Sequence, residues 1–405
     1  MSYRGHGMKM FQDELERIKK SGLYRQMKYL QSPQQPYVKI MGQDYLMLSS
    51  NSYLGLCNDF RLKQAAREAI EEYGVGSGGS RLTTGSYEVH KKLENEIAAF
   101  KGTEAALLFN TGYMANVGAI SSIAGKEWVI FSDRLNHASI IDGCKLSGAE
   151  IVIYEHCDAS DLEKKAHGRR GKRALVVTDG LFSVDGDIAP LPEIVRVAKK
   201  YNMLLMVDDA HATGVLGENG GGTADYFGLQ NEIDIQMGTF SKALASEGGF
   251  IAGNRDLIDY LTNKARSFIF STALSPATVA VSLKALEIVQ AQPCLRQSLM
   301  ANAAWFRKRL KEAGFHVMDF PTQIISIVLG QPEPTVNFSN RLMDKNIFVS
   351  AIRPPTVPQG TSRLRINMMA THTIDDLTRA INSITTIGEE IGILKDTGNK
   401  LKVNC

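Results

Sequence analysis

The sequence predicts an α/β protein whose larger domain is built on a mainly parallel sheet of seven strands. Three observations support this fold class: the chain of 405 residues exceeds one small domain, seven short segments are almost continuously apolar, and helical segments lie between many of them. Such alternation is typical of a parallel sheet covered by helices on both faces. The predicted strands are residues 105–109, 128–131, 151–154, 174–178, 204–208, 233–237 and 250–252.

The regions on either side of this sheet have different patterns. After about residue 275, two long helical segments precede shorter strands and helices, which indicates a smaller α+β domain. We therefore expect an N-terminal helix and strand segment (1–50), a large ligand-binding α/β domain (51–275) and a C-terminal α+β domain (276–405). Further helices are predicted over 59–73, 87–101, 190–201, 276–291, 295–313, 335–345 and 374–392, and further strands over 45–48, 324–329 and 364–368.

The N-terminal segment has an amphipathic pattern. Over residues 8–30, Phe11, Leu15 and Ile18 fall on one stripe of a predicted helix. The same segment is rich in basic residues, which form either the solvated face of that helix or an attractive surface for a phosphate-rich substrate. These residues are Arg17, Lys19, Lys20, Arg25 and Lys28.

The composition argues against several classes of protein. The formal net charge of +3 gives no electrostatic reason to expect a nucleic acid or a membrane surface as partner. No run approaches the roughly 18 apolar residues needed to span a bilayer, and the polar N-terminus lacks the apolar core of a secretory signal. The five cysteines form no C-x-x-C pair, so neither a disulfide framework nor a zinc site is predicted. These features indicate a cytoplasmic protein.

The glycine-rich stretch from Gly74 to Gly79 matches the pattern G-x-G-x-x-G. A dinucleotide-binding fingerprint follows a strand and opens a helix, whereas this stretch follows a predicted helix and leads into a loop. We therefore reject dinucleotide binding. The sequence favours a loop whose glycines allow close approach of the backbone to another surface.

Lys242 and Asp208 form the most informative pair in the chain. Asp208 ends the predicted strand 204–208, and Lys242 follows the next predicted strand, between Ser241 and Ala243. A pyridoxal-phosphate enzyme requires a lysine that forms a Schiff base with the cofactor and a carboxylate that keeps the pyridine nitrogen protonated. The alternative is a surface lysine and a buried capping aspartate. The pair predicts pyridoxal 5'-phosphate as cofactor.

Other residues suited to a ligand also follow predicted strands. Open parallel sheets bind ligands at the carboxyl ends of their strands, and a helix that begins at a glycine offers free N–H groups to a phosphate. Each position alone also suits an ordinary turn or cap. Asp208, Asp209 and His211 are alternatively metal ligands, but no second ligand cluster follows, and we expect no metal. The strand-end residues are Gly112, His137, Ser183, His211 and Thr239.

Arg353 lies in a proline-rich segment near the C-terminus. It precedes Pro354 and Pro355, which disfavour a helix and favour an extended loop. A guanidinium on such a loop suits a bidentate clamp for a carboxylate. A structural salt bridge is the alternative.

Taken together, these motifs resemble the α-oxoamine synthases, which are fold-type I pyridoxal-phosphate enzymes, over nearly the whole chain. The resemblance implies an architecture like that of aspartate aminotransferase and a homodimer with active sites at the subunit interface. The matching stretches are LSSNSYLGL (48–56), GSGGSR (76–81), NHAS (136–139), VDDAH (207–211), TFSK (239–242), ST (271–272) and RLRI (363–366).

The resemblance also implies residue roles and substrates. The stretch AIRPPTVP (351–358) is most similar to the branch that condenses L-alanine with pimeloyl-CoA or pimeloyl-ACP in biotin synthesis, releasing CO2 and the thiol carrier. Lys242, Asp208, His137 and His211 would be catalytic. The cofactor would be contacted by Gly112, Tyr113, Ser183, His211 and Thr239, its counterpart in the neighbouring subunit by Ser271 and Thr272, and the substrates by Arg25, Asn51, His137, Arg353 and Thr356.

Three other functions remain open at this point. A sister enzyme would use glycine and acetyl-CoA, and an aminotransferase would convert the cofactor to its amine form with alanine. A non-catalytic cofactor-binding module is the third, although no added DNA-binding or interaction domain supports it.

Overall fold

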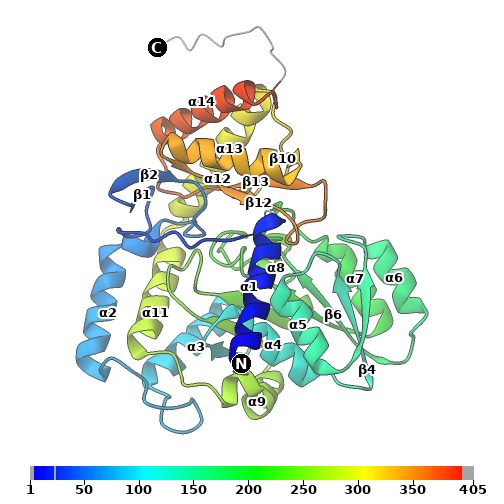
Figure 1. The fold of residues 1–405 in the computed structure, drawn as a ribbon. Helices are drawn as coiled ribbons and strands as arrows, with labels where there is room; N and C mark the ends of the chain where they lie inside the picture. Colours follow the sequence, from blue (N-terminus) through cyan, green and yellow to red (C-terminus); the bar gives the residue numbers. More distant parts are fainter. Residues whose placement is uncertain (1–3, 22–23, 395–405) are drawn as a thin grey trace.

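The computed structural model describes residues 4–21 and 24–394, and its centre is a seven-stranded sheet (Figure 1). The strand order is β3-β9-β8-β7-β6-β4-β5. β9 runs antiparallel to both its neighbours, and the other pairs in this sheet are parallel. The predicted sheet is therefore confirmed, and each strand lies within two residues of its predicted bounds. The strands are β3 (Ala105–Phe109), β4 (Trp128–Asp133), β5 (Glu150–Tyr154), β6 (Arg173–Asp179), β7 (Leu204–Asp208), β8 (Ile235–Thr239) and β9 (Gly249–Gly253).

Both faces of the sheet are covered by helices. Alternate residues of a strand point to opposite faces, so Val129 and Phe131 pack with one set of helices and Ile130 packs with the other. This explains why the strands are apolar along their whole length. One face carries α6 (Ala159–His167) and α7 (Leu191–Tyr201), and the other carries α4 (Gly112–Ile123), α5 (Ala138–Ser147) and α9 (Arg255–Lys264).

The C-terminal elements form the upper part of the molecule in Figure 1. β10 (Ile324–Gly330), β13 (Ser362–Asn367) and β12 (Ser350–Ile352) make a three-stranded antiparallel sheet. Its buried side chains share one core with the long helix that leads out of the large sheet. The helices of this part are α12 (Pro293–Glu312), α13 (Pro332–Asp344) and α14 (Ile374–Glu390), and α11 (Pro276–Ala291) leads to them from the lower part of the figure; all four were predicted from the periodicity.

A second small sheet ties the N-terminal segment to this C-terminal part. β1 (Tyr37–Ile40) pairs with β2 (Gln43–Met47), and β2 also pairs in parallel with β11 (Ile347–Phe348). Two further helices, α2 (Phe60–Tyr73) and α3 (Glu88–Lys101), then pack against α11. Residues 37–47 and residues 347–348 therefore share one small sheet although they lie far apart in the sequence.

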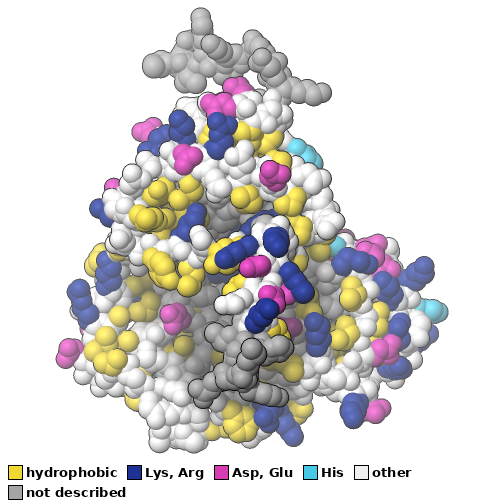
Figure 2. Space-filling view, in the orientation of Figure 1, with side chains coloured by type: hydrophobic (Ala, Val, Ile, Leu, Met, Phe, Trp, Pro, Cys, Tyr) yellow, Lys and Arg dark blue, Asp and Glu magenta, His cyan; other side chains and the backbone are white. Residues whose placement is uncertain are grey.

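The prediction of a helix over residues 8–30 was wrong at its end, because α1 (Arg4–Lys20) stops at Lys20. Residues 24–29 are exposed, so no apolar face remains there to hold a helix. Phe11 and Leu15 of the predicted stripe are 59% and 46% exposed. Figure 2 shows Lys and Arg side chains gathered on the face where α1 lies.

Three other predictions bear on this fold. The stretch Gly74–Gly79 follows helix α2 and no strand, which confirms that it is not a dinucleotide-binding fingerprint. The four cysteines of the described residues, Cys57, Cys144, Cys157 and Cys294, are free thiols. Within the same residues, no helix has the length and apolar character to cross a membrane.

Candidate active site

A cavity of about 200 Å³ lies at the carboxyl ends of β6, β7 and β8 and beside the start of α4. Strand β3 leads into this edge, because it runs parallel to β8 across the antiparallel β9. The parallel sheet therefore brings together groups that lie far apart in the sequence. The lining residues are Thr111, Gly112, Tyr113, Asn116, His137, Ser139, Asp179, Asp208, Ala210, His211, Met237, Thr239, Ser241 and Lys242.

Lys242 lies in the turn after β8 and is half-buried. Among the described residues, its ammonium group has no hydrogen-bond or ion-pair partner. Burial lowers the pKa of Lys242 to about 8, against the opposing attraction of Asp208. A substantial fraction of the amine is therefore neutral near physiological pH, as a nucleophile or a base requires.

Asp208 ends β7 and is 2% exposed. Its Oδ2 accepts a hydrogen bond of 2.6 Å from Asn116 Nδ2, and its Oδ1 accepts one of 2.8 Å from the Ala210 N–H. Asn116 Nδ2 also donates to Ser139 Oγ at 2.8 Å. The carboxylate is thus fixed in place at the floor of the cavity.

The start of α4 forms another wall of the cavity. Thr111 caps this helix, and its side chain accepts a hydrogen bond of 3.0 Å from the Met114 N–H. Gly112 must be small, because a Cβ there would lie 2.9 Å from Met237 Cε. The first N–H groups of a helix have no partner within the helix and carry partial positive charge, so this wall suits an anion such as a phosphate.

His137 precedes α5 and enters the cavity from a third direction. Its N–H donates to Asp179 Oδ2 at 2.7 Å, and its Nδ1 lies 2.7 Å from Ser139 Oγ. Burial lowers the pKa of His137 although Asp208 opposes the effect, so the ring is neutral near pH 7. Burial, reinforced by the charge of Asp208, raises the pKa of Asp179 well above its usual range.

His211 connects the cavity to the C-terminal sheet. Its Nδ1 lies 2.7 Å from the Tyr53 hydroxyl, and Arg365 Nη2 lies 3.5 Å from the same oxygen. Burial lowers the pKa of His211 well below its usual range and raises the pKa of Tyr53 to about 12. The neutral ring shares a hydrogen bond with the Tyr53 hydroxyl, which also lies 3.2 Å from Asn51 Oδ1.

Asn51, which the sequence predicted to contact substrate, lies close to this network. Its Oδ1 accepts hydrogen bonds from Arg365 Nη2 at 3.2 Å and from Asn367 Nδ2 at 3.0 Å. Both donors lie on β13, which places Asn51 between the large sheet and the C-terminal sheet.

Several predicted site residues do not line the cavity. Ser183 lies in the loop after β6, and Thr272 forms an isolated bridge with Ser80. Arg353, directly after β12, donates to the Tyr24 carbonyl oxygen at 3.4 Å. The residues that stay outside the cavity lining are Arg25, Asn51, Ser183, Ser271, Thr272, Arg353 and Thr356.

Sequence reasoning missed four polar residues of this region. Asn116 donates to Asp208 and to Ser139. Asp179 accepts from the backbone N–H of His137, and Arg365 donates to Asn51. A signal existed for Asn116, since it lies one helical turn after Gly112 on the same face. Arg365 lay in the matched stretch 363–366 but received no role.

The alternative that Asp208, Asp209 and His211 bind a metal ion is contradicted by the side-chain directions. Asp209 points away from the cavity and accepts a hydrogen bond of 3.1 Å from the buried Lys101. It also accepts hydrogen bonds from Thr223. Asp208 and Asp209 are neighbours at the end of β7, and their side chains therefore point to opposite faces of the sheet.

Comparison with known proteins agrees with this architecture. The pattern of the family described as Aminotransferase class I and II matches residues 43–384. A putative 8-amino-7-oxononanoate synthase of Acetivibrio thermocellus is 53% identical over 95% of this chain and 99% of its own length. The 8-amino-7-oxononanoate synthase of Lysinibacillus sphaericus is 51% identical, with the same coverage of 95% and 99%.

Among solved structures, the K265A variant of serine palmitoyltransferase from S. paucimobilis, with a bound PLP–myriocin aldimine, superimposes with a TM-score of 0.90. It is 33% identical and covers 95% of this chain and 98% of its own. The 8-amino-7-oxononanoate synthase of Francisella tularensis has a TM-score of 0.75 at 28% identity, with 85% and 98% covered. The predicted fold class, that of the fold-type I transferases, is therefore confirmed, and the chain belongs to the aminotransferase class I and II family and, within it, to the α-oxoamine synthases.

Proposed function

We propose that this protein is an 8-amino-7-oxononanoate synthase of the cytoplasm. In this reaction L-alanine and a pimeloyl thioester give 8-amino-7-oxononanoate, CO2 and the free thiol carrier. The observation that carries the proposal is the sequence identity of 53% and 51%, over nearly the full length, to two proteins of this name. The solved serine palmitoyltransferases are more distant in sequence, at 30–34% identity.

The cavity residues fit pyridoxal 5'-phosphate. Lys242 would hold the cofactor aldehyde, since its amine is half-buried, without a partner and partly neutral. Asp208 would hold the proton on the pyridine nitrogen, and the N–H groups at Gly112 and Tyr113 would hold the phosphate. Asn116 Oδ1 is buried without a partner among the described residues and faces the same space. The cofactor, when bound, supplies an electron sink for the charge that develops at the α-carbon of the amino acid.

The residues of this chain would then carry out proton transfer and orientation. Lys242 Nζ takes the α-proton of alanine and returns a proton to the product, for which a pKa near 8 is suitable. His137, kept neutral by burial, offers a flat face to the ring without adding charge. His211, whose Nδ1 is held by the Tyr53 hydroxyl, would contact the cofactor through its other ring nitrogen. Thr239 and Ser183 are proposed as additional cofactor contacts.

We assign the carboxylate of alanine to Arg365 rather than to Arg353. The α-carbon must lie at Lys242 Nζ, and Arg365 is the guanidinium whose charge lowers the pKa of both Lys242 and His211. Its buried Nε has no partner among the described residues, so a donor is free for a ligand. Arg353, in the loop after β12, then suits the distal carboxylate of the pimeloyl chain, and Thr356 and Arg25 are proposed as further contacts of that chain. Asn51, which accepts from Arg365, is proposed as a contact at the alanine end.

We also propose a homodimer whose interface includes the region around Ser271 and Thr272. Phe270 beside them is 71% exposed and Leu82 is 52% exposed, so an apolar surface is left uncovered by the single chain. Asn110 Nδ2 donates to the Thr272 carbonyl at 2.6 Å, which links this surface to the loop before Gly112. Ser271 and Thr272 would thereby reach the phosphate site of the neighbouring subunit.

One experiment tests the function against its rivals. The purified holoenzyme is incubated with L-alanine, glycine or L-serine, each paired with pimeloyl-CoA, acetyl-CoA or palmitoyl-CoA, and products are identified by mass spectrometry. We expect 8-amino-7-oxononanoate from alanine and pimeloyl-CoA as the dominant product. A faster reaction of glycine with acetyl-CoA, or of serine with palmitoyl-CoA, would overturn the assignment.

A further inference from the structure

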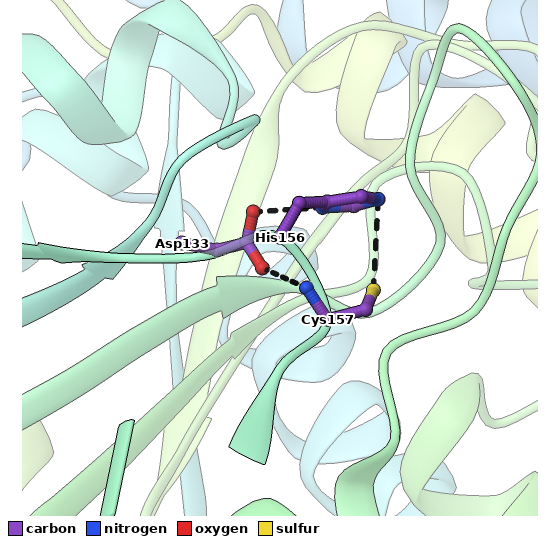
Figure 3. A group of neighbouring side chains, drawn as sticks. All are labelled: Asp133, His156 and Cys157. Carbon is purple, nitrogen blue, oxygen red and sulfur yellow. Dashed lines mark hydrogen bonds and ion pairs between the residues drawn. The ribbon is translucent and has the colours of Figure 1, made fainter. Parts of the chain in front are cut away.

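A second cluster of donor atoms lies at the ends of β4 and β5, and none of its residues lines the cavity. His156 lies between two carboxylates: its Nδ1 is 2.9 Å from Asp133 Oδ1, and its Nε2 is 2.7 Å from Asp187 Oδ2. Cys157 Sγ lies 3.6 Å from His156 Nε2 and 3.7 Å from Asp187 Oδ2. Figure 3 shows how Asp133, His156 and Cys157 point toward one another.

We propose that His156 Nε2, Cys157 Sγ and Asp187 Oδ2 form a binding site for a divalent cation of the Zn²⁺ class. Tetrahedral zinc with bonds of about 2.3 Å to sulfur and about 2.0–2.1 Å to nitrogen and oxygen separates sulfur from either lighter ligand by about 3.5–3.6 Å. The two sulfur distances here, 3.6 and 3.7 Å, already match this spacing. The nitrogen–oxygen pair, at 2.7 Å, must open to about 3.3 Å.

Asp133 supplies the support that a metal-binding histidine needs. Its Oδ1 accepts from His156 Nδ1, which orients the ring so that Nε2 is directed at Asp187 Oδ2 and Cys157 Sγ. Its Oδ2 accepts a hydrogen bond of 2.8 Å from the Cys157 N–H and so fixes the next ligand as well. Cys157 has a φ of 54°, a left-handed conformation that is uncommon for cysteine, and this conformation sets the direction of its side chain.

Metal binding at this site is an exchange of one dication for two protons. The proton on His156 Nε2 and the thiol proton of Cys157 leave to solvent as the metal–nitrogen and metal–sulfur bonds form. The His156 side chain is 27% exposed, against 1% for Asp133, so an ion can enter from the His156 side, and water can fill the fourth position.

The test is a titration of the chelator-treated holoenzyme with Co²⁺, followed by Zn²⁺ competition. We expect one equivalent to bind, with four-coordinate cobalt bands to the red of the cofactor absorption. X-ray absorption of the zinc form should show one sulfur at about 2.3 Å. Cys157→Asn should remove the sulfur signal and keep the fold, since asparagine tolerates a positive φ. Asp133→Asn should weaken binding by about 10–100-fold.

Cys294→Ser is the matched control, because Cys294 is an exposed thiol on α12 outside the cluster, and it should bind like the wild type. Circular dichroism and a melting curve establish that each variant is folded. Absence of stoichiometric binding by the folded wild type would overturn the proposal. An unchanged sulfur signal in Cys157→Asn would overturn it too.

Discussion

The cavity around Lys242 and the loop after β12, which carries Arg353 and Thr356, are built in different ways. In the cavity, the strand ends of one sheet fix each side chain, and hydrogen bonds of 2.6–2.8 Å join Asn116, Asp208 and Ser139. In the loop after β12, the Arg353 guanidinium has one hydrogen bond among the described residues, of 3.4 Å to a backbone carbonyl, and Thr356 is exposed. The chemistry is therefore held by the rigid sheet. If this loop recognises the acyl chain, as we propose, substrate preference can change there without loss of the fold.

The largest effect is expected at the lysine of the cavity. Lys242→Ala should reduce turnover of alanine and pimeloyl-CoA by on the order of 10⁴-fold or more, because both the cofactor attachment and the proton carrier are removed. Borohydride treatment followed by mass spectrometry should leave the cofactor on the wild-type chain and not on the variant. Appreciable turnover by the variant would remove Lys242 from the catalytic role.

Substitution of the two neighbouring carboxylates at the end of β7 should have different effects: one variant should lose turnover and the other should lose stability. Asp208→Asn should lower turnover by on the order of 10³-fold at an almost unchanged melting temperature. Asp209→Asn breaks the buried pair with Lys101 and should lower the free energy of unfolding by about 3–5 kcal/mol. A loss of rate below tenfold in the first variant would contradict the electron-sink role of Asp208.

The two arginines test the division between cavity and loop. Arg365→Ala should raise the KM for L-alanine by on the order of 10²-fold, because a charge-assisted contact in a half-buried site is lost. Arg353→Ala should instead raise the KM for pimeloyl-CoA by roughly tenfold, with the melting temperature unchanged. Arg353→Lys should restore part of the loss, since ammonium lacks the planar fork. If Arg353→Ala weakens only alanine, the two assignments are reversed.

The smallest effect concerns the stability of the apoprotein. Unfolded lysine has a pKa of 10.5 and folded Lys242 about 8, so between these values the unfolded chain binds more protons. Stability should therefore rise with pH across this window, and below pH 8 the buried ammonium costs about 3 kcal/mol. Apo Lys242→Met should be more stable than apo wild type at pH 7 by up to that amount. Urea unfolding at pH 7 and 10 measures the difference, which should shrink at the higher pH.

The sequence predicted the strands well because each is buried on both faces, which makes it apolar along its whole length. It also predicted that Asp208 and Lys242 lie close together, since the carboxyl ends of parallel strands share one edge of the sheet. It did not predict that Arg365 contacts Asn51 and Tyr53, because these contacts join β13 to a segment more than 300 residues earlier in the chain. The His156 cluster escaped for the same reason: its members, residues 133, 156, 157 and 187, come from three different strand ends and loops.

The antiparallel strand β9 has a consequence for how the chain acquires its site during synthesis. β9 pairs with β3 on one side and β8 on the other, so Phe109 meets Gly249 across 140 residues of sequence. The start of α4 and the turn bearing Lys242 cannot be brought to their final separation until residues 249–253 have left the ribosome. A nascent chain that is released before this point lacks the strand that joins its phosphate-binding wall to its lysine, and the order of translation therefore makes cofactor capture a late event.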